Sequence, residues 1–401
     1  MYKNIINYIF LFSLITLGWL PSLHSSNLCT NLFETRTNPI INNIDENNTL
    51  VFLRSNPKWS WDWLYKKIFN SNNKILIKTL DFIGIVGGDI KPDNVEIVKQ
   101  KNGNYEIGIT DLDDSGTGQL FIDFVHTLIY NAEWPFKIKK KEVIELYLNG
   151  LNGVEMKFKH KLSEIDRYFQ KIKSENDKKN KNRTINLFDK NLSEEKFYKY
   201  LKLKSLEDSS KEAQEIYAEA SNDILKALES YGKIIHFGVR VKNKGGSMKL
   251  PRFSYLTDIN EEALLVIEVK LQSKDPAVRY GHHVQGSARD RILEVLKNYR
   301  PQNSESSILE VIKTDGNHEF IIRLKTEPVV DLEYVMKDDE EAIEYYQDFL
   351  RQMYYWQGQI HRSQSKRYIK FWSENREFLS DSAIQLMYEH IEDAKNMNNK
   401  P

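Results

Sequence analysis

The sequence predicts an α+β fold, because strand-like and helix-like segments occupy separate stretches of the chain. Apolar and polar residues alternate over residues 95–110, and again in several runs between residues 234 and 270. Charged segments with helical periodicity fill most of residues 143–228, and another begins near Glu340. With 401 residues and 40% hydrophobic content, the chain can form a sizeable core and roughly two to three lobes.

Charge and cysteine content narrow the class of protein. The chain has 57 Lys and Arg and 57 Asp and Glu, so its formal net charge is zero. Without a basic surplus, nothing in the composition favours a nucleic-acid partner. The single cysteine excludes an internal disulfide.

Residues 1–26 have the order of a secretory signal peptide. Lys3 supplies the positive charge, Ile5–Leu20 is mostly apolar, and residues 21–26 provide small side chains for cleavage. We therefore expect an exported protein, either periplasmic or secreted. The alternative is an uncleaved segment that anchors the protein to the membrane.

The most informative stretch contains a short predicted hairpin with acidic residues at one end. Its first strand follows Asp89 and Asn94, and its second strand ends at Asp111 and Asp113. A strand with period-two alternation delivers the residues after it to one edge of the hairpin. We therefore expect these four side chains to lie close together.

This group of residues has the composition that phosphoryl transfer requires. The reaction needs a carboxylate to orient the attacking hydroxyl, oxygen ligands for Mg²⁺, and a cation near the transferred group. Asp89 is the expected base, Lys91 the nearby cation, and Asn94, Asp111 and Asp113 the metal ligands. The alternative is an acidic hairpin turn with a solvated rim.

The segments before this hairpin predict a helix and then a strand. Thr49–Arg54 is typical of a short strand or of the start of a helix. Trp59, Trp61 and Trp63 form an aromatic helical face that we expect in the core. The nearly continuous apolar run Ile75–Val86 predicts a buried strand that leads into the acidic segment.

Helical periodicity begins after the acidic cluster, at Gly116, and continues to Tyr130. Asp123 would be buried in this helix, so we expect it to bond to the backbone of the loop around Asp89. The alternative is that Asp123 is a capping or surface residue. His126 is expected to be a core histidine.

A second unit begins near Tyr231 with a hairpin and a buried strand. The expected strands are Ile234–Val241, Arg252–Leu256 and Ala263–Lys270. Glycine-rich turns let backbone amides approach phosphates, and a lysine at the end of a buried strand can pair with them. We therefore expect Gly245, Gly246, Ser247 and Lys270 to bind a cofactor. The alternative is an ordinary hairpin without a ligand.

The last third of the sequence mixes helices with one more strand. Val284–Tyr299 predicts a helix, whose Glu294 either pairs with Lys270 or faces solvent. Glu319–Leu324 predicts a strand, and the chain is helical from Glu340 onward.

The order of these segments resembles the order found in a known family. The segment Asp89–Asn94 resembles the catalytic loop of protein kinases, and Thr110–Leu112 resembles the strand-end Asp motif of that superfamily. In ordinary kinases the glycine-rich hairpin and strand lysine precede the catalytic loop, whereas here they follow it. This order resembles the bacterial family named domain of unknown function 2252, whose members belong to the protein-kinase-like superfamily and look circularly permuted.

The resemblance covers most of the chain after residue 26. The matching segments are Phe52–Ser55, Gly88–Asn94, Thr110–Asp113, Asp123, Leu146–Gly150, Gly245–Ser247, Val269–Lys270 and Gln359–Ser363. It implies a two-lobed, circularly permuted kinase-like fold that uses ATP and Mg²⁺, with Asp123 and His361 as structural support. In such a permuted fold we expect Lys270 to point toward Asp111. The implied layout is a signal peptide (1–26), a catalytic-loop part of the helical lobe (27–154), a helical insert or linker (155–228), a small β-rich lobe (229–330) and helices that complete the helical lobe (331–401).

Two functions remain open at this point. The first is a Mg-ATP-dependent phosphotransferase, or nucleotidyl transferase, that binds a nucleotide and an unknown acceptor. The second is a catalytically inactive pseudo-kinase that acts as a binding or scaffold protein. Departures from the family pattern bear on this choice, because Leu271 and Gln272 follow Lys270 where the family has Glu-Ala, and Gly87 and Gly88 stand where protein kinases carry His-Arg.

Overall fold

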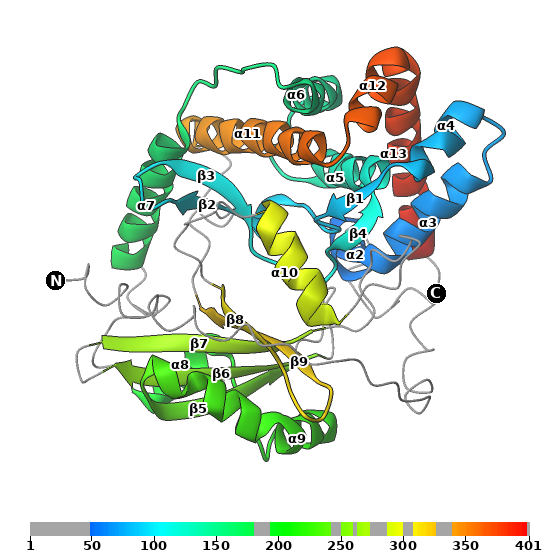
Figure 1. Cartoon of the computed structure of the whole chain (residues 1–401). Coiled ribbons are helices and arrows are strands. Elements are labelled where there is room, and N and C mark those ends of the chain that lie inside the picture. The colour runs from blue at the N-terminus through cyan, green and yellow to red at the C-terminus, as the bar shows by residue number, and fades with distance from the viewer. Residues whose placement is uncertain are drawn as a thin grey trace. The chain divides into compact units, whose positions relative to one another are not determined.

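The computed structural model describes seven stretches of the chain: residues 49–179, 193–241, 250–259, 263–272, 287–299, 308–325 and 339–398. All of them belong to one compact unit that spans Ile40–Pro401. Helices and strands are both abundant (Figure 1), which confirms the predicted α+β class. The predicted signal peptide and Gly245–Ser247 lie outside the described residues. Within the described stretches, every helix is too short or too polar to cross a membrane.

The helical part is built around one fully buried helix. The helices of this part are α2 (Thr49–Ser55), α3 (Pro57–Phe69), α4 (Lys74–Lys78), α5 (Leu120–Glu133), α6 (Lys140–Asn152), α7 (Leu162–Lys179), α11 (Glu340–Gln364), α12 (Lys366–Glu374) and α13 (Arg376–Asn398). In α5, every residue from Leu120 to Asn131 is buried. A helix that is buried on all sides must be surrounded by other elements, so α5 forms the centre of this core.

The helical part also contains two short two-stranded sheets, of which the first packs against α5. Strand β1 (Ile83–Val86) pairs antiparallel with β4 (Gly116–Gln119), and β2 (Val95–Lys99) pairs antiparallel with β3 (Tyr105–Ile109). The second pair is the predicted hairpin, and the contact between Val95 and Ile109 fixes its register. The predicted hairpin is thus confirmed.

Two predictions in this region need correction, and one open alternative is decided. The predicted strand Ile75–Val86 is strand only from Ile83, because the side chain of Asn73 caps a helical turn there, α4, which continues into the 3-10 segment η2 (Thr79–Asp81). The predicted helix over Gly116–Tyr130 begins only at Leu120, since its first four residues pair with β1. Of the two alternatives for Thr49–Arg54, the structure has the helix.

The second part is a five-stranded antiparallel sheet. Its strands are β5 (Lys233–Val241), β6 (Pro251–Ile259), β7 (Ala263–Leu271), β8 (Ile308–Lys313) and β9 (Glu319–Leu324), in the spatial order β5-β6-β7-β9-β8. The predicted strands within β5, β6, β7 and β9 are confirmed, whereas β8 was not predicted. Helices α8 (Glu194–Leu201) and α9 (Lys211–Leu228), which fall in the predicted insert 155–228, pack on this sheet.

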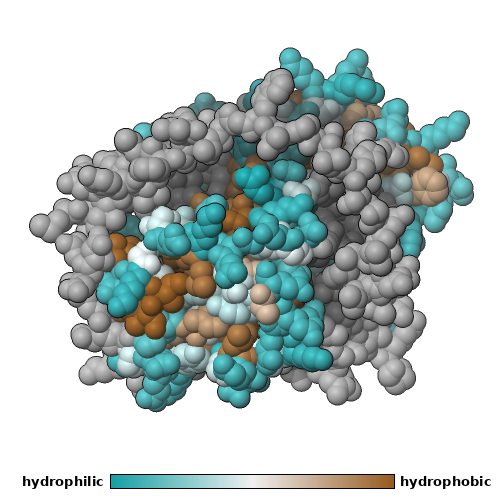
Figure 2. All heavy atoms as spheres, turned by 60° about the horizontal axis from the view of Figure 1, so that its bottom comes forward, coloured by the Kyte–Doolittle hydropathy of each residue, from teal (hydrophilic) through white to brown (hydrophobic). Residues whose placement is uncertain are grey.

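The two faces of the sheet differ in chemistry. One face carries Phe253, Val269 and Ile322, which pack with the apolar side of α9. Figure 2 shows the molecule from the side of α9 and β5, where hydrophobic side chains lie among hydrophilic ones. On the other face, Arg252 lies opposite Lys270 in the strand register. Since side chains alternate between faces, this face is charged near the start of β6, whereas it is apolar where α8 packs against it.

Helix α10 (Ala288–Tyr299) lies between the five-stranded sheet and the two small sheets (Figure 1). Its buried side chains Ile292, Val295 and Tyr299 join the same core as α5. Val311 of β8 and Ile321 of β9 belong to that core as well. The charged face of the sheet is therefore attached to the helical part through α10.

Helices α6 and α11 cross at two glycines. A Cβ atom on Gly150 would lie 2.1 Å from the carbonyl oxygen of Tyr355, and one on Gly358 would lie 2.1 Å from that of Tyr147. Any larger residue at either position would force the helices apart. This close crossing places His361, one turn after Gly358, next to Tyr147.

Candidate functional site

The loop after β1 is held from both sides at Gly88. This glycine has φ 75, a conformation that costs other residues free energy. Its N–H donates to Asp123 Oδ1 at 2.8 Å, and its carbonyl oxygen accepts from Trp61 Nε1 at 2.6 Å. The loop that contains Asp89 is therefore anchored to two helices before any ligand binds.

Asp123 is itself held by a buried network. Its Oδ2 accepts from Gln357 Nε2 at 2.9 Å and lies 3.1 Å from His361 Nε2. The other ring nitrogen of His361, Nδ1, lies 2.8 Å from the Tyr147 hydroxyl. The expected bond from Asp123 to the loop backbone is confirmed, and the alternative of a capping or surface Asp123 is wrong, because its side chain is 1% exposed.

Asp89 is buried and surrounded by donors. Lys91 forms an ion pair with its Oδ2, and Asn94 Nδ2 donates to the same oxygen at 2.9 Å. The Tyr130 hydroxyl donates to Oδ1 at 2.7 Å. Burial alone would raise the pKa of the Asp89 carboxyl, but Lys91 and these hydrogen bonds hold it below its usual value. Asp89 is therefore a carboxylate at neutral pH.

Tyr130 is a site residue that the sequence analysis missed. It lies on α5, seven residues after Asp123, and such spacing places two residues on the same face of a helix. A search of that face for polar side chains would have found it. Burial raises the pKa of the Tyr130 hydroxyl well above its usual value, so it remains a hydrogen-bond donor to Asp89.

The neighbouring His126 lies in the core, as expected. Its ring is buried between the rings of Trp61 and Tyr130. Burial lowers the pKa of His126 to about 4, so the imidazole is neutral at physiological pH.

The second group of site residues joins two distant parts of the sequence. Lys270 Nζ lies 2.8 Å from Asp111 Oδ1 and 2.5 Å from Asp113 Oδ2. The expected contact between Lys270 and Asp111 is present, although 159 residues separate them. Lys270 and Asp113 are buried, and Asp111 is 31% exposed. Burial would raise the pKa of Asp111, but Lys270 and Arg323 lower it well below its usual value.

The three expected metal ligands lie near one another. The Thr110 N–H donates to the carbonyl oxygen of Asn94 at 2.9 Å, which places Asn94 beside Asp111. Asp113 Oδ1 is buried and has no hydrogen-bond partner among the described residues. The described part of the chain contains no group of three or more His, Cys, Asp or Glu that could hold a metal. However, Mg²⁺ needs only one or two carboxylates when phosphates and water complete its shell, so this donor set fits Mg²⁺ bound with a nucleotide.

A cluster of cations beside Lys270 was also missed. Buried Glu268 accepts from Arg323 Nε at 2.9 Å and lies 3.5 Å from both Arg252 and Lys325. Arg323 also donates to the carbonyl oxygen of Thr110 at 3.2 Å. Glu268 raises the pKa of Lys325, but burial and the nearby arginines outweigh this and lower it. Positive charge is thus in excess on this face.

Helix α10 contributes an arginine, Arg291, to this region, whereas its Glu294 does not take part. Glu294 is exposed, which agrees with the alternative that it faces solvent. Arg291 is buried and donates to the carbonyl oxygens of Leu112 at 2.9 Å and Ser115 at 2.6 Å. It therefore fixes the backbone on both sides of Asp113.

Comparison with known proteins identifies no relative. No protein-family model, no curated protein and no solved structure matches this chain. A function for this chain must therefore be inferred from the geometry of these residues.

Proposed function

We propose that this protein is an exported, kinase-like phosphotransferase that uses Mg-ATP and an unknown acceptor, with a circularly permuted, two-lobed kinase-like fold. The observation that carries the proposal is the contact of Lys270 with Asp111 and Asp113, next to the anchored loop that holds Asp89. Phosphoryl transfer needs this combination of a positioned carboxylate, acidic metal ligands and a strand lysine.

Each residue has a distinct role in this proposal. Asp89 orients the acceptor hydroxyl and accepts its proton, and Lys91 offsets charge on the transferred group. Asp111, Asp113 and the amide oxygen of Asn94 hold Mg²⁺, while Lys270 binds the phosphates. Bound Mg²⁺ would neutralise charge that develops on the phosphate oxygens.

The cation cluster supports a donor that carries several negative charges. Arg252, Arg323 and Lys325 share one buried carboxylate, that of Glu268. A phosphate chain beside Lys270 would reduce the repulsion among these cations. It would also raise the lowered pKa of Lys325.

A pseudo-kinase is the second candidate, and a specific observation favours it. Lys270 binds the carboxylates of both Asp111 and Asp113, which together form the acidic pair, and both carboxylate oxygens of Asp89 accept hydrogen bonds from side chains. A protein that holds these groups for stability alone would show the same contacts.

Calorimetric titration of ATP with Mg²⁺, beside a transfer assay with unbiased acceptors, tests the proposal. Asp111→Asn should abolish Mg²⁺-dependent nucleotide binding, whereas Asp89→Asn should retain binding and lose transfer. Asp81→Asn, which changes an exposed carboxylate paired with Lys78, is the matched control. Nucleotide binding without turnover would leave the pseudo-kinase, and a wild-type protein that binds no nucleotide would contradict both candidates.

A further inference from the structure

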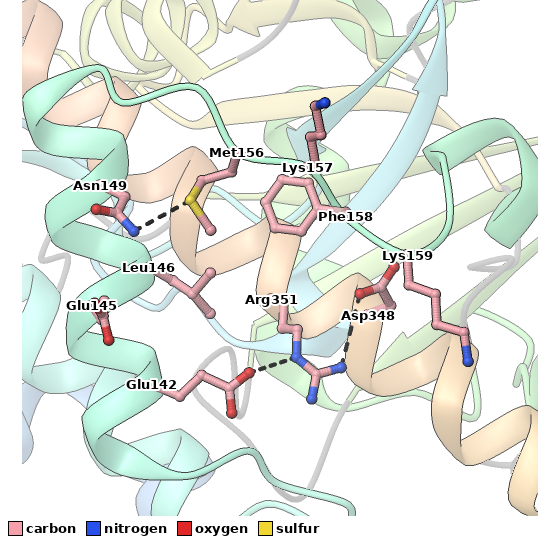
Figure 3. Close-up of a pocket in the computed structure, with 10 residues that line it drawn as sticks. All are labelled: Glu142, Glu145, Leu146, Asn149, Met156, Lys157, Phe158, Lys159, Asp348 and Arg351. Atoms are coloured by element: carbon pink, nitrogen blue, oxygen red, sulfur yellow. Dashed lines mark hydrogen bonds and ion pairs between the residues drawn. The ribbon is translucent and has the colours of Figure 1, made fainter.

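Two cavities in the described part of the chain differ in their charge. The first, of about 380 Å³, lies between α6 and α11. Its lining contains three acidic and three basic side chains. Figure 3 shows Arg351 in contact with Glu142 and Asp348, at 2.6 and 3.8 Å. The charges of this first cavity are thus balanced by its own residues.

The second cavity, of about 420 Å³, lies where α5 ends, α6 begins and α13 passes. Ile138, Met387 and Ile391 line it with apolar surface, and all three are buried. Tyr388, which is 54% exposed, lies at its edge. A volume of this size and an apolar lining are typical of sites for small organic molecules.

The second cavity has a surplus of positive charge. Its basic lining residues are Lys137, Lys139, Lys140 and Lys395. Among the described lining residues Glu133 is the one acidic side chain, so the formal charge of this lining is +3. An anion in this cavity would therefore be attracted, whereas a cation would be repelled.

The start of α6 adds to this preference. Its N-cap residue, Lys139, makes no side-chain hydrogen bond to the first turn. The first N–H groups of a helix carry partial positive charge, so anions are favoured there and cations are not. The acidic residue of the first turn, Glu142, pairs with Arg351 at the first cavity, so a bound anion would offset the repulsion between Lys139 and Lys140.

The loop that forms one wall of the second cavity is strained. Phe136 has φ 55, a left-handed conformation that is costly for a bulky side chain. Its ring packs against Tyr346 of α11, which holds it in place. Such strain is often found in segments that hold ligands, and here it places Lys137 and Ile138 at the cavity.

We propose that this second cavity binds a small anionic amphiphile, a molecule with an apolar body and one carboxylate or phosphate group. The apolar body contacts Ile138, Met387 and Ile391, and the anionic group lies among the lysines near the start of α6. This site is separate from Asp89 and Lys270 and does not depend on phosphotransferase activity.

Laurate is a suitable probe in calorimetric titrations of the full chain. Wild-type protein should bind laurate, and 1-dodecanol and inorganic phosphate should each bind at least about tenfold more weakly, because each lacks one half of the interaction. The double variant Lys139→Glu/Lys395→Glu should weaken laurate binding by about tenfold or more.

The control is a double variant with the same change of net charge at the first cavity, Lys157→Glu/Lys159→Glu, which should bind laurate as wild type does. Circular dichroism confirms that each variant is folded. The proposal is overturned if laurate does not bind, if dodecanol binds equally well, or if both double variants weaken binding to the same extent.

Discussion

Two groups place carboxylates against a lysine but are assembled differently: the Asp89 group, in which side-chain donors surround Asp89, and the acidic pair, which shares Lys270. Lys91 is two residues from Asp89, and every other donor to this carboxylate comes from within 41 residues. Lys270 reaches Asp111 across 159 residues and from a different sheet. The first group can form within one local segment, whereas the second exists only when the sheet is attached to the helical part.

The two groups also differ in how the carboxylates are satisfied. Asp89 has three side-chain donors, whereas Asp111 and Asp113 share Lys270, and Asp113 Oδ1 has no hydrogen bond from any residue that the structure describes. Loss of the lysine should therefore cost more at the acidic pair than at Asp89.

The largest effect is expected for Lys270→Met. It leaves two carboxylates without their shared cation, so the free energy of unfolding at pH 7 should fall by about 3–5 kcal/mol. Urea denaturation measures it, with the exposed Lys233→Met as control. Adding Asp111→Asn and Asp113→Asn should restore part of the loss. A loss below about 1 kcal/mol would show that the nearby arginines are enough to compensate the charge of the two carboxylates.

The next largest effect concerns how the free energy of unfolding depends on pH. The pKa of His126 is about 4 in the folded protein, below its value of about 6.5 in an unfolded chain. The unfolded chain therefore binds the proton more readily, and stability is full above pH 6.5 and decreases as pH falls toward 4. His126→Gln should remove about 3 kcal/mol of this decrease.

Urea denaturation at pH 7 and pH 4 checks this expectation. His390 is also buried with a lowered pKa, so the His126→Gln/His390→Gln variant should remove more of the decrease than either single change. Asp111 acts in a lower pH range: its stabilisation is present above the unfolded pKa of Asp, near 4, and is lost as pH falls toward the lower folded pKa of Asp111. An unchanged pH dependence in His126→Gln would contradict this separation.

Lys91→Met should have a smaller effect than Lys270→Met. Asp89 would keep the hydrogen bonds from Tyr130 and Asn94, so the expected loss is about 1.5–3 kcal/mol. The same urea measurement at pH 7 allows direct comparison. A loss that equals or exceeds that of Lys270→Met would mean that local assembly gives Asp89 no additional tolerance.

Tyr130→Phe is expected to have the smallest effect. It removes one donor from Asp89, so stability should fall by about 1 kcal/mol and the pKa of Asp89 should rise. NMR titration of the Asp89 carboxyl measures that pKa. Tyr354→Phe, which removes a hydroxyl bonded to Asn131 instead, is the matched control and should leave the pKa unchanged.

Local patterns predicted the hairpin correctly but misassigned the segment before it. The hairpin from Val95 to Ile109 was predictable, because its alternation and turn are contained in a few residues. The run Ile75–Val86 was misassigned because a continuous apolar segment does not distinguish helix from strand. The cap at Asn73 decided the outcome there.

The cation cluster could not be predicted from local pattern. Arg323 reaches Glu268 because β9, and not β8, lies next to β7 in the sheet. That order depends on how distant segments pair. The contact of Lys270 with Asp111 was expected only because the order of segments resembles a known family.

The long separation between Asp111 and Lys270 has a consequence for synthesis of the chain. Domains fold as their segments leave the ribosome, starting from the amino terminus. Asp111 and Asp113 emerge well before β7, and Asp113 must remain hydrated until Lys270 arrives. Burial of this acidic pair is thus a late event, and a nascent chain stalled before β7 would contain the hairpin with its carboxylates still open to solvent cations.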